Sequence, residues 1–325
     1  MQYSIEQVND QDGIASKKSK SWGARKMDNK RVQAAFASLH LDNYAARLGN
    51  CSSCLRYEVC ENGHRHLEDA NFCRVRLCPI CDWRRSLKYF GQIMQIMHEA
   101  YQRRPDMRYV FLTLTVVNVP GEELAGMLDK LFKGFNRLFK YKDVDAATVG
   151  WIRALEVTYN REANTYHPHF HVLLAVKADY FGRSYITQPR WREYWRRAMQ
   201  LDYLPEVRIE AVYKNKMRDG ETAGVTSEIA KYTVKPDDIL QANEELMVDI
   251  VGTLHIALHH RRLIGFGKLF RELKVELKLP DLDALDADLT DEVNFECTCP
   301  ICQSVMRPMM YRWHIGFESY ILSGE

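Results

Sequence analysis

Tyr166-His167-Pro168-His169-Phe170-His171-Val172-Leu173-Leu174 is a run of β-forming residues in which histidines recur at every second position. In a β-strand, residues i and i+2 point to the same face, about 7 Å apart. His169 and His171 are therefore expected side by side on one face of a strand. Neutral imidazole is a common ligand for Zn²⁺, Mn²⁺ and related ions, so this strand is a candidate metal site.

The residues around this run predict a mixed sheet domain over residues 105–240. A strand rich in β-branched and aromatic residues covers 109–117, and Pro120 opens a helix with apolar residues at helical spacing. The elements expected next are strands at 150–159, up to 176 and at 207–213, and helices at 189–201 and 222–235, the last ended by Pro236. The order β-α-β-β-α-β-α predicts an α+β fold with a ferredoxin-like or RRM-like antiparallel sheet.

A third metal ligand is needed, because His167 and His171 lie about 13 Å apart along a regular strand, too far to bind one small ion. If the hairpin turn centres near residues 162–163, Glu156 on the preceding strand lies opposite His169 and on the same face. Two histidines and a carboxylate leave coordination positions open for substrate oxygens. His167 is the alternative ligand if the proline after it bends the strand. Mn²⁺ and Mg²⁺ both suit this donor set, and the imidazoles favour Mn²⁺.

Residues 51–104 have the spacing of a zinc-binding region. Nine cysteines in a chain that begins without the apolar core of a signal peptide favour metal ligands over disulfides. Two C-x2-C pairs can complete a tetrahedral, structural Zn²⁺ site with no open position. The simplest ligand set is Cys51, Cys54, Cys78 and Cys81, and the further candidates, for this site or a second one, are Cys60, Cys73, His64 and His66. Buried free thiols are the alternative.

Residues 241–325 are expected to form a mostly helical C-terminal segment, with a helix at 254–262 and an acidic linker at 281–292. Three cysteines and a histidine follow the linker, and they make a complete zinc ligand set although their spacing is atypical. The sequence therefore predicts a second zinc knuckle with the ligands Cys297, Cys299, Cys302 and His314.

Residues 1–50 are expected to be a flexible basic tail that leads into a short amphipathic helix at 31–48. No stretch of the chain approaches the roughly 18–20 apolar residues of a membrane helix, so we expect a cytosolic protein without a membrane partner. The 325 residues are 46% hydrophobic, which suffices for a globular core. The net charge is only +2, so a nucleic-acid surface has to come from local clustering.

One such cluster lies between residues 183 and 218, where basic residues alternate with Trp191, Tyr194 and Trp195. Basic side chains can contact the phosphates of single-stranded DNA while aromatic rings stack on its bases. The candidate DNA-binding residues are Arg190, Arg192, Arg196, Arg197, Lys214 and Lys216. Four more arginines lie beside the cysteines, namely Arg74, Arg76, Arg84 and Arg85. An ordinary solvated helix face explains the first cluster equally well.

The helix expected at 222–235 brings three reactive groups together. Glu228, Tyr232 and Lys235 have the spacing i, i+4, i+7 and project from one face. A tyrosine hydroxyl beside an ammonium group can attack a metal-polarised phosphate to form a phosphotyrosine, and Glu228 could help to resolve that adduct. Taken alone, this segment is explained as an amphipathic helix whose tyrosine and lysine are half-buried packing residues. An isolated His-x-His is likewise explained by two ordinary strand histidines that bind no metal.

Three segments together resemble the motifs of HUH-superfamily replication initiators. In chain order they are Phe111-Leu112-Thr113-Leu114-Thr115, His167-Pro168-His169-Phe170-His171 and Glu228-Ile229-Ala230-Lys231-Tyr232-Thr233-Val234-Lys235. The likeness is greatest to Rep proteins of rolling-circle plasmids that use one catalytic tyrosine, with a glutamate four residues before it. The segment from Cys78 to Arg85 also resembles the cysteine-rich region of such proteins. This likeness implies that the arginines beside the cysteines take part in origin recognition.

The resemblance implies a bacterial cytoplasmic enzyme that initiates rolling-circle replication of a plasmid. A divalent ion on His169 and His171 would polarise the scissile phosphate of a single-stranded or hairpin origin. Tyr232 would attack that phosphate, giving a 5′-phosphotyrosine and a 3′-OH primer. Glu228 would assist the second cleavage, and Lys235 would position or charge-balance the tyrosyl phosphate.

Two other functions fit the same residues. A single-tyrosine relaxase or transposase shares the metal and tyrosine chemistry, although the upstream cysteines and the spacing of Glu228 and Tyr232 favour replication. A zinc-dependent DNA-binding regulator without catalysis would use the histidine strand only as structure. The sequence leaves open whether the protein is a monomer or a dimer, and whether its C-terminal segment recruits a host helicase.

Overall fold

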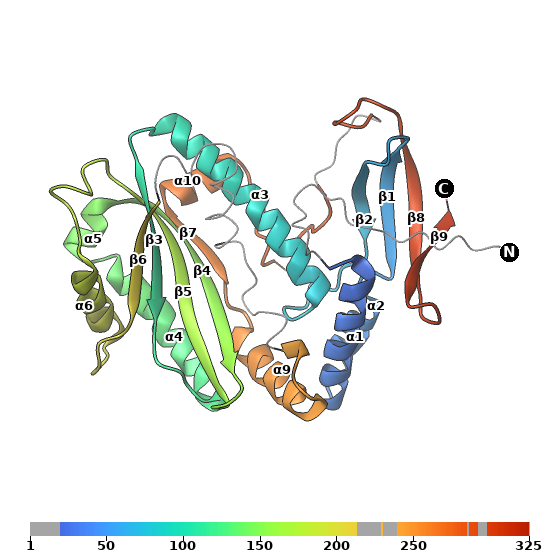
Figure 1. Ribbon diagram of the computed structural model, residues 1–325, viewed down its shortest axis with the longest axis horizontal. Helices are drawn as coiled ribbons and strands as arrows, with labels where there is room; N and C mark the ends of the chain where they lie inside the picture. Colours follow the sequence, from blue (N-terminus) through green and yellow to red (C-terminus); the bar gives the residue numbers. More distant parts are fainter. Residues whose placement is uncertain (1–19, 213–228, 230–238, 285, 292–297, 325) are drawn as a thin grey trace. The chain divides into compact units, whose positions relative to one another are not determined.

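The computed structural model describes residues 20–212, 229, 239–284, 286–291 and 298–324 (Figure 1). The described residues form two units, each with its own antiparallel sheet. Those within Tyr89–Asp238 and Thr253–Asp283 make up the histidine unit, and those within Met1–Lys88, Ile239–Gly252 and Ala284–Glu325 make up the cysteine unit. This division differs from the four consecutive segments expected from the sequence, because strands that are far apart in the chain share one sheet.

The histidine unit is built on a five-stranded sheet with the strand order β6-β3-β5-β4-β7, in which all neighbours are antiparallel. The strands are β3 (Arg108–Thr115), β4 (Thr148–Asn160), β5 (Thr165–Val176), β6 (Val207–Val212) and β7 (Ile264–Lys268). The first four, with the helices between them, follow the β-α-β-β-α-β order of ferredoxin-like folds. The predicted α+β class with an antiparallel sheet is confirmed.

Helices α4 (Gly121–Leu138) and α6 (Gln188–Met199) lie on one side of this sheet (Figure 1), and the short α5 (Lys142–Ala147) comes between them in the chain. The apolar residues expected to face the core from α4 are all buried, namely Leu124, Leu128, Leu131, Phe135 and Leu138. Phe135 meets Phe170 of β5 edge-on, with ring centroids 5.5 Å apart. Because side chains alternate along a strand, this contact directs His169 and His171 to the other face.

The other face of the sheet is apolar in one half and polar in the other. Its apolar half packs against α10 (Leu269–Glu276) and against the residues of α3 (Pro79–Arg103) that belong to this unit. The buried residues of this cluster include Tyr109, Ala154, Leu173 and Ile229. The polar half carries Thr113, Glu156 and His171 and is where the candidate site lies.

Strand β7 was not expected from the sequence. It alternates glycines with larger residues, and glycine weakens the strand signal because it has no side chain to pack. Gly267 pairs with Trp151 of β4, and a Cβ added at Gly267 would lie 2.0 Å from Trp151 Cε2. The glycine therefore lets β7 pair beside the indole.

The C-terminal segment, predicted to be mostly helical, contains the helices α9 (Glu244–Leu258) and α10. It also supplies three strands, which were not expected.

The cysteine unit joins two hairpins into one sheet with the order β2-β1-β8-β9. The first hairpin consists of β1 (Cys54–Cys60) and β2 (Arg65–Ala70), and the second consists of β8 (Met306–His314) and β9 (Ser319–Gly324). Pairing of β1 with β8 connects them, and the Tyr57 and Tyr311 rings meet across these strands at 6.1 Å.

Residues 22–50 form two packed helices, whereas the sequence predicted a single helix at 31–48 after a tail. Helix α1 (Trp22–Ser38) begins after Ser21, whose hydroxyl accepts a hydrogen bond from the Ala24 N–H. His40 has a left-handed φ of 58°, a conformation that commonly ends a helix, and α2 (Asp42–Asn50) follows it. Trp22 of α1 is completely buried, so this region belongs to the core. The expected tail at 1–19 lies outside the described residues.

Replacing Gly267 by alanine is expected to destabilise the histidine unit by about 1–3 kcal/mol, the usual cost of overpacking. The reason is overlap of the new methyl group with the Trp151 indole. Urea unfolding followed by circular dichroism measures the change. The control is Gly126→Ala in α4, where no atom lies within 4 Å of an added Cβ, and it should stabilise the protein by about 0.5–1 kcal/mol. Equal stability of Gly267→Ala and wild type would contradict the prediction.

Candidate functional site

The hairpin of β4 and β5 sets the register of the site. Its turn ends at Asn164, which has a left-handed φ of 48° and accepts a hydrogen bond from the Tyr159 hydroxyl at 2.7 Å. Asparagine tolerates this backbone conformation better than most residues do. The resulting register pairs Glu156 with His169. The register predicted from the sequence is therefore confirmed.

The side chains of Glu156, His169 and His171 converge on the polar half of the sheet face. His171 Nε2 lies 2.9 Å from Glu156 Oε2, and His169 Nε2 lies 3.6 Å from the same oxygen. One donor atom from each residue falls within 4.8 Å of the others. Two imidazole nitrogens and one carboxylate oxygen form a donor set that suits Mn²⁺ and related divalent ions and leaves positions open for other ligands. These three residues could therefore hold a metal ion.

Oxygen atoms on the far side of each imidazole orient the two rings. Thr113 Oγ1 of β3 lies 3.4 Å from His171 Nδ1, and the main-chain oxygen of His167 lies 3.2 Å from His169 Nδ1. Such partners direct the opposite nitrogen, Nε2, toward the metal position. This role of Thr113 was not predicted from the sequence. Its signal is the alternation in β3, which puts Thr113 opposite His171 once the strands are paired.

The site is shielded from solvent, and its charges depend on one another. The side chains of Glu156, His169 and His171 are only 7%, 10% and 13% exposed. Burial alone would raise the pKa of the Glu156 carboxyl, but the neighbouring His169 and His171 outweigh it and hold this pKa well below its usual range. A buried carboxylate that stays ionised beside two imidazoles is ready to take up a cation.

His167, the alternative ligand, lies next to the group but not in it. Its ring stacks on His169 with centroids 5.1 Å apart, and its nitrogens are not among the converging atoms. Pro168 pairs regularly with Val157, so the proline does not bend the strand toward the site. Burial, and then the proximity of His169, lowers the pKa of His167.

Two further polar side chains share this face. Thr115 follows Thr113 by two positions on β3, and Arg208 of β6 pairs directly with Thr113. The Arg208 side chain is 78% exposed and forms an ion pair with Glu210 at 2.5 Å. An arginine two strands from His171 is about 10 Å away, within reach of a phosphate next to one held at the metal.

The four candidate DNA-binding arginines of α6 lie on the other side of the sheet. Each is in an ion pair: Arg190 with Asp143 at 2.8 Å, Arg192 with Glu206 at 2.8 Å, and Arg196 and Arg197 with Glu193 at 2.8 and 3.6 Å. The helix surface is therefore close to charge balance. Lys214 and Lys216 lie outside the described residues.

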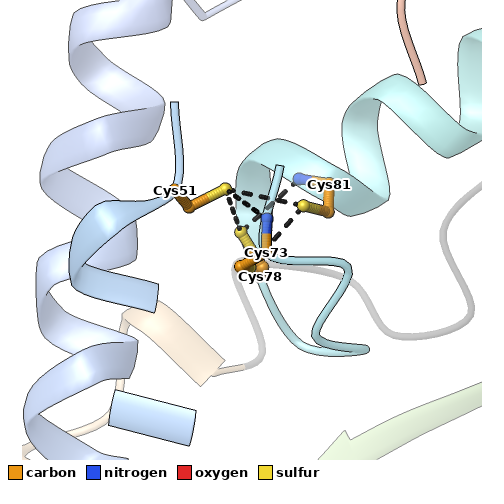
Figure 2. Close-up of side chains that lie close together, drawn as sticks. All are labelled: Cys51, Cys73, Cys78 and Cys81. Carbon is orange, nitrogen blue, oxygen red and sulfur yellow. Dashed lines mark hydrogen bonds between the residues drawn. The ribbon is translucent and has the colours of Figure 1, made fainter. Parts of the chain in front are cut away.

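Four buried cysteines of the cysteine unit, Cys51, Cys73, Cys78 and Cys81, form a second group (Figure 2). The Cys51 sulfur lies 3.5 Å from those of Cys78 and Cys81, and Cys73 lies 3.6 Å from Cys81. In a tetrahedral zinc site with bonds of about 2.3 Å, the sulfurs stand about 3.8 Å apart. The Arg74 main-chain N–H also donates to the Cys81 sulfur at 3.2 Å. The group is therefore suited to a metal ion with four sulfur ligands.

The fourth member of this group is Cys73, whereas the simplest zinc ligand set predicted from the sequence contained Cys54. Cys54 is the first residue of β1 and pairs with Arg312 of β8, so the sheet holds it outside the group. The spacing of the first C-x2-C pair was thus misleading, because only Cys51 of that pair belongs to the group of four sulfurs. His66, another candidate, lies 4.0 Å from Asp291.

A buried lysine and two buried arginines belong to the same unit as the four cysteines. Lys26 donates to the main-chain oxygens of Gly49 and Cys51, and burial lowers its pKa although the nearby Cys51 opposes this shift.

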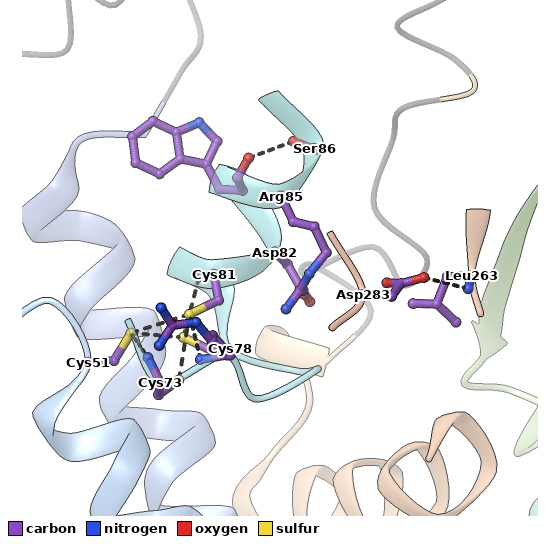
Figure 3. Close-up of polar contacts among 11 residues, drawn as sticks. Cys51, Cys73, Cys78, Cys81, Asp82, Arg85, Ser86, Leu263 and Asp283 are labelled. Carbon is purple, nitrogen blue, oxygen red and sulfur yellow. Dashed lines mark hydrogen bonds and ion pairs between the residues drawn. The ribbon is translucent and has the colours of Figure 1, made fainter. Parts of the chain in front are cut away.

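The two arginines pair with carboxylates. Arg84 is 1% exposed and pairs with Asp291 at 2.5 Å. Figure 3 shows Arg85 directed at Asp82, its ion-pair partner. Burial raises the pKa of Asp82 to about 7, against the effect of Arg85. Arg84 and Arg85, expected to contact the origin, are instead part of the core.

Cys299 and Cys302 lie beside Cys60 and His64 rather than beside His314. The His314 ring packs on Phe317, with centroids 4.5 Å apart. The sequence-based set for the second zinc knuckle differs from the observed group because the first hairpin supplies two of its members. Cys297 lies outside the described residues, as do Glu228, Tyr232 and Lys235.

The fold and the site define a class of protein: an α+β domain whose antiparallel sheet bears two histidines and a glutamate that could hold a metal ion, combined with a cysteine-rich unit. Residues 64–321 match the family model described as "Replication protein", Rep_1. The chain belongs to this replication protein family. The resemblance that the sequence motifs indicated is thereby confirmed.

Several curated relatives resemble the chain over most of its length. A "Protein rep" of Streptococcus pneumoniae serotype 2 is 38% identical over 86% of both chains, and one of Bacillus amyloliquefaciens is 37% identical over 96% of both. A third, from Lentilactobacillus hilgardii, is 36% identical over 94% of this chain and 96% of its own. No solved structure matches the chain. Within the described residues, every helix is too short or too polar to cross a membrane.

Metal binding at the candidate site is expected to depend on Glu156 and His171 but not on His167. We expect Glu156→Gln and His171→Ala to abolish Mn²⁺ binding in isothermal titration calorimetry, and Thr113→Val to weaken it by about 10- to 100-fold, as loss of an orienting partner does. His167→Gln is the matched control and should bind like wild type. Loss of binding in His167→Gln, with binding intact in His171→Ala, would contradict the assigned ligand set.

Proposed function

We propose that this protein initiates rolling-circle replication of a plasmid by nicking single-stranded origin DNA. The observation that carries this proposal is the convergence of Glu156, His169 and His171 on one polar sheet face in a member of the replication protein family. The family favours replication over the transfer or transposition that related tyrosine enzymes carry out. The donor set favours catalysis over a purely structural histidine strand, because three ligands leave positions open for a substrate.

The three ligands would hold a divalent cation, with Mn²⁺ favoured over Mg²⁺ by the two imidazoles. When bound, such an ion supplies Lewis acidity to a phosphate group. Glu156 contributes the negative charge of the site, and Thr113 fixes the ring of His171. The buried position of these side chains keeps competing water away from them.

We assign the role of nucleophile to Tyr232. Support comes from Ile229, which is fully buried and belongs to the same core cluster as Ala154 and Leu173 on the sheet face of Glu156. Three residues of chain span at most about 11 Å, a length that would allow a tyrosine three positions after Ile229 to act at this face. The expected helical spacing puts Glu228 and Lys235 on the same side as the tyrosine.

The proposed step conserves all atoms and charges. The Tyr232 oxygen forms a bond to phosphorus while the bond from phosphorus to O3′ breaks. The phenol gives up its proton and O3′ gains one, so the products are a 5′-phosphotyrosine and a free 3′-OH. The phosphodiester energy is retained in the tyrosyl bond, and the 3′-OH can prime synthesis. Lys235 would balance the charge of the adduct, and Glu228 would activate the hydroxyl that resolves a second cleavage.

DNA beside the cleaved phosphate would contact the edge of the sheet at β6. Arg208 is exposed there and shares the face of the metal site. The ion pairs of the α6 arginines are solvent-exposed, and such pairs contribute only about 0–1 kcal/mol, so phosphates can replace the acidic partners. A second contact surface on α6 is therefore compatible with the proposal, although it would bind DNA away from the site of cleavage.

In the cysteine unit we propose a structural zinc ion bound by Cys51, Cys73, Cys78 and Cys81. The support is the set of four buried sulfurs at nearly tetrahedral separations. Four thiolates with one Zn²⁺ carry two negative charges, and Lys26 is a buried cation close enough to offset part of them.

Tyr232→Phe is expected to abolish the covalent protein–DNA adduct while origin binding stays unchanged. The swap removes one hydroxyl at nearly constant volume, so packing is preserved. The measurement is incubation with a labelled single-stranded origin oligonucleotide and Mn²⁺, followed by denaturing electrophoresis. Tyr101→Phe, which alters a tyrosine that is 49% exposed on α3, is the control and should form the adduct as wild type does.

EDTA present during the incubation should prevent wild type from forming the adduct as well. If wild type binds a verified origin and never cuts it, the protein is a DNA-binding regulator and the nicking proposal fails.

Glu228→Gln is expected to form the first adduct at a near-normal rate but to release product about 10²- to 10⁴-fold more slowly, because the general base is lost. A chase with unlabelled origin after adduct formation measures the release. Glu162→Gln, in the exposed turn between β4 and β5, serves as the matched control. Normal release by Glu228→Gln would assign the second step to another group.

A further inference from the structure

Four donor atoms from distant parts of the chain meet at the end of the cysteine-unit sheet. Cys60 Sγ lies 3.4 Å from His64 Nδ1 and 3.6 Å from Cys302 Sγ, and Cys299 Sγ lies 3.5 Å from the same His64 nitrogen. A tetrahedral zinc ion with bonds of about 2.0–2.3 Å places its nitrogen and sulfur ligands about 3.5–3.8 Å apart. The four atoms thus already have the spacing of a closed zinc site.

Two tight turns present these ligands in pairs. In the first, the Gly63 N–H donates to Cys60 O at 2.9 Å, and Gly63 has a φ of 78° that favours glycine. In the second, the Gln303 N–H donates to Cys299 O at 2.8 Å, and Gln303 is held at a φ of 61°. A left-handed conformation at a residue other than glycine is unfavourable by itself, so the surroundings must hold it in place.

Among the described residues, the second turn has few shielded contacts with the sheet besides these four ligands. Its apolar side chains, Ile301 and Val305, are 72% and 66% exposed, so hydrophobic burial contributes little. The hydrogen bonds of Ser304 to Glu61 and Asn62 are exposed to solvent and are weak for that reason. In contrast, Cys299 and Cys60 point inward and are 1% and 4% exposed.

We propose that Cys60, His64, Cys299 and Cys302 bind a second structural zinc ion, which clamps the loop before β8 to the β1–β2 hairpin. Thiolate ligands favour zinc over Mg²⁺ or Mn²⁺, and four protein ligands leave no position for a substrate. The ion would close a loop of more than two hundred residues, a constraint that disfavours the unfolded chain. This proposal is independent of the nicking reaction.

The two cysteine-containing sites should differ in how fast they exchange metal. Every ligand of the Cys51 group is buried, whereas His64 and Cys302 are partly exposed. A chelator reaches a partly exposed site first. The clamp should therefore lose its ion before the Cys51 group does, and the β8–β9 hairpin should then become sensitive to protease.

The test compares the zinc content of the full-length protein and its variants after gel filtration. Wild type should retain two thiolate-bound zinc ions, Cys302→Ser and Cys60→Ser one, and Cys54→Ser, whose cysteine lies in neither group, two. Substitution with Co²⁺ separates these sites from the histidine site, because only thiolate ligands give a sulfur-to-cobalt charge-transfer band. Part of this band should disappear in Cys302→Ser.

Zinc content that is the same in wild type, Cys302→Ser and Cys60→Ser would overturn the proposal. So would a Cys60–Cys302 disulfide found by mass spectrometry in protein purified without oxidant. If Cys302→Ser aggregates, His64→Cys provides a second variant: it keeps four ligands, should retain both ions and should strengthen the charge-transfer band. Loss of zinc from His64→Cys would equally contradict the site.

Discussion

The register of the β4–β5 hairpin is the constraint on which the histidine unit depends. Side chains alternate along each strand, so a slip of one residue would exchange the two faces of the sheet. If β5 slipped, His169 and His171 would point toward α4, and Phe170 would lose its contact with Phe135. The same register therefore fixes the apolar core on one side and the metal ligands on the other. Packing and site geometry support each other, which explains how a short polar turn can specify both.

Much of this unit could be predicted because its signals are local. Alternation predicts the strands, leucine spacing predicts α4, and counting back from the turn finds Glu156 opposite His169. Strand β7 could not be predicted in this way, because its five residues include two glycines and its partner β4 lies more than a hundred positions earlier. The role of Thr113 could not be predicted for a related reason. It depends on the pairing of β3 with β5, and the residue pattern of one strand does not show which strand is its neighbour.

The spacing of the cysteines in the sequence does not determine which of them come together in the fold. A C-x2-C pair indicates a turn that can present two sulfurs, but tertiary contacts decide which turns meet. Cys54 is held in a strand, so Cys73 completes the first group. Cys302 finds its partners in the β1–β2 hairpin because β1 pairs with β8. Both corrections follow from sheet contacts between segments that are remote in sequence.

Pairing of β1 with β8 also determines the order in which the units can form on the ribosome. The described residues of the histidine unit end at Asp283, whereas β8 and β9 extend to Gly324. The histidine unit can thus fold before β8 is available to pair with β1 of the β1–β2 hairpin. During that interval one edge of the hairpin is unpaired, and unpaired edges promote aggregation. The unpaired edge therefore creates a risk of misfolding in the cysteine unit.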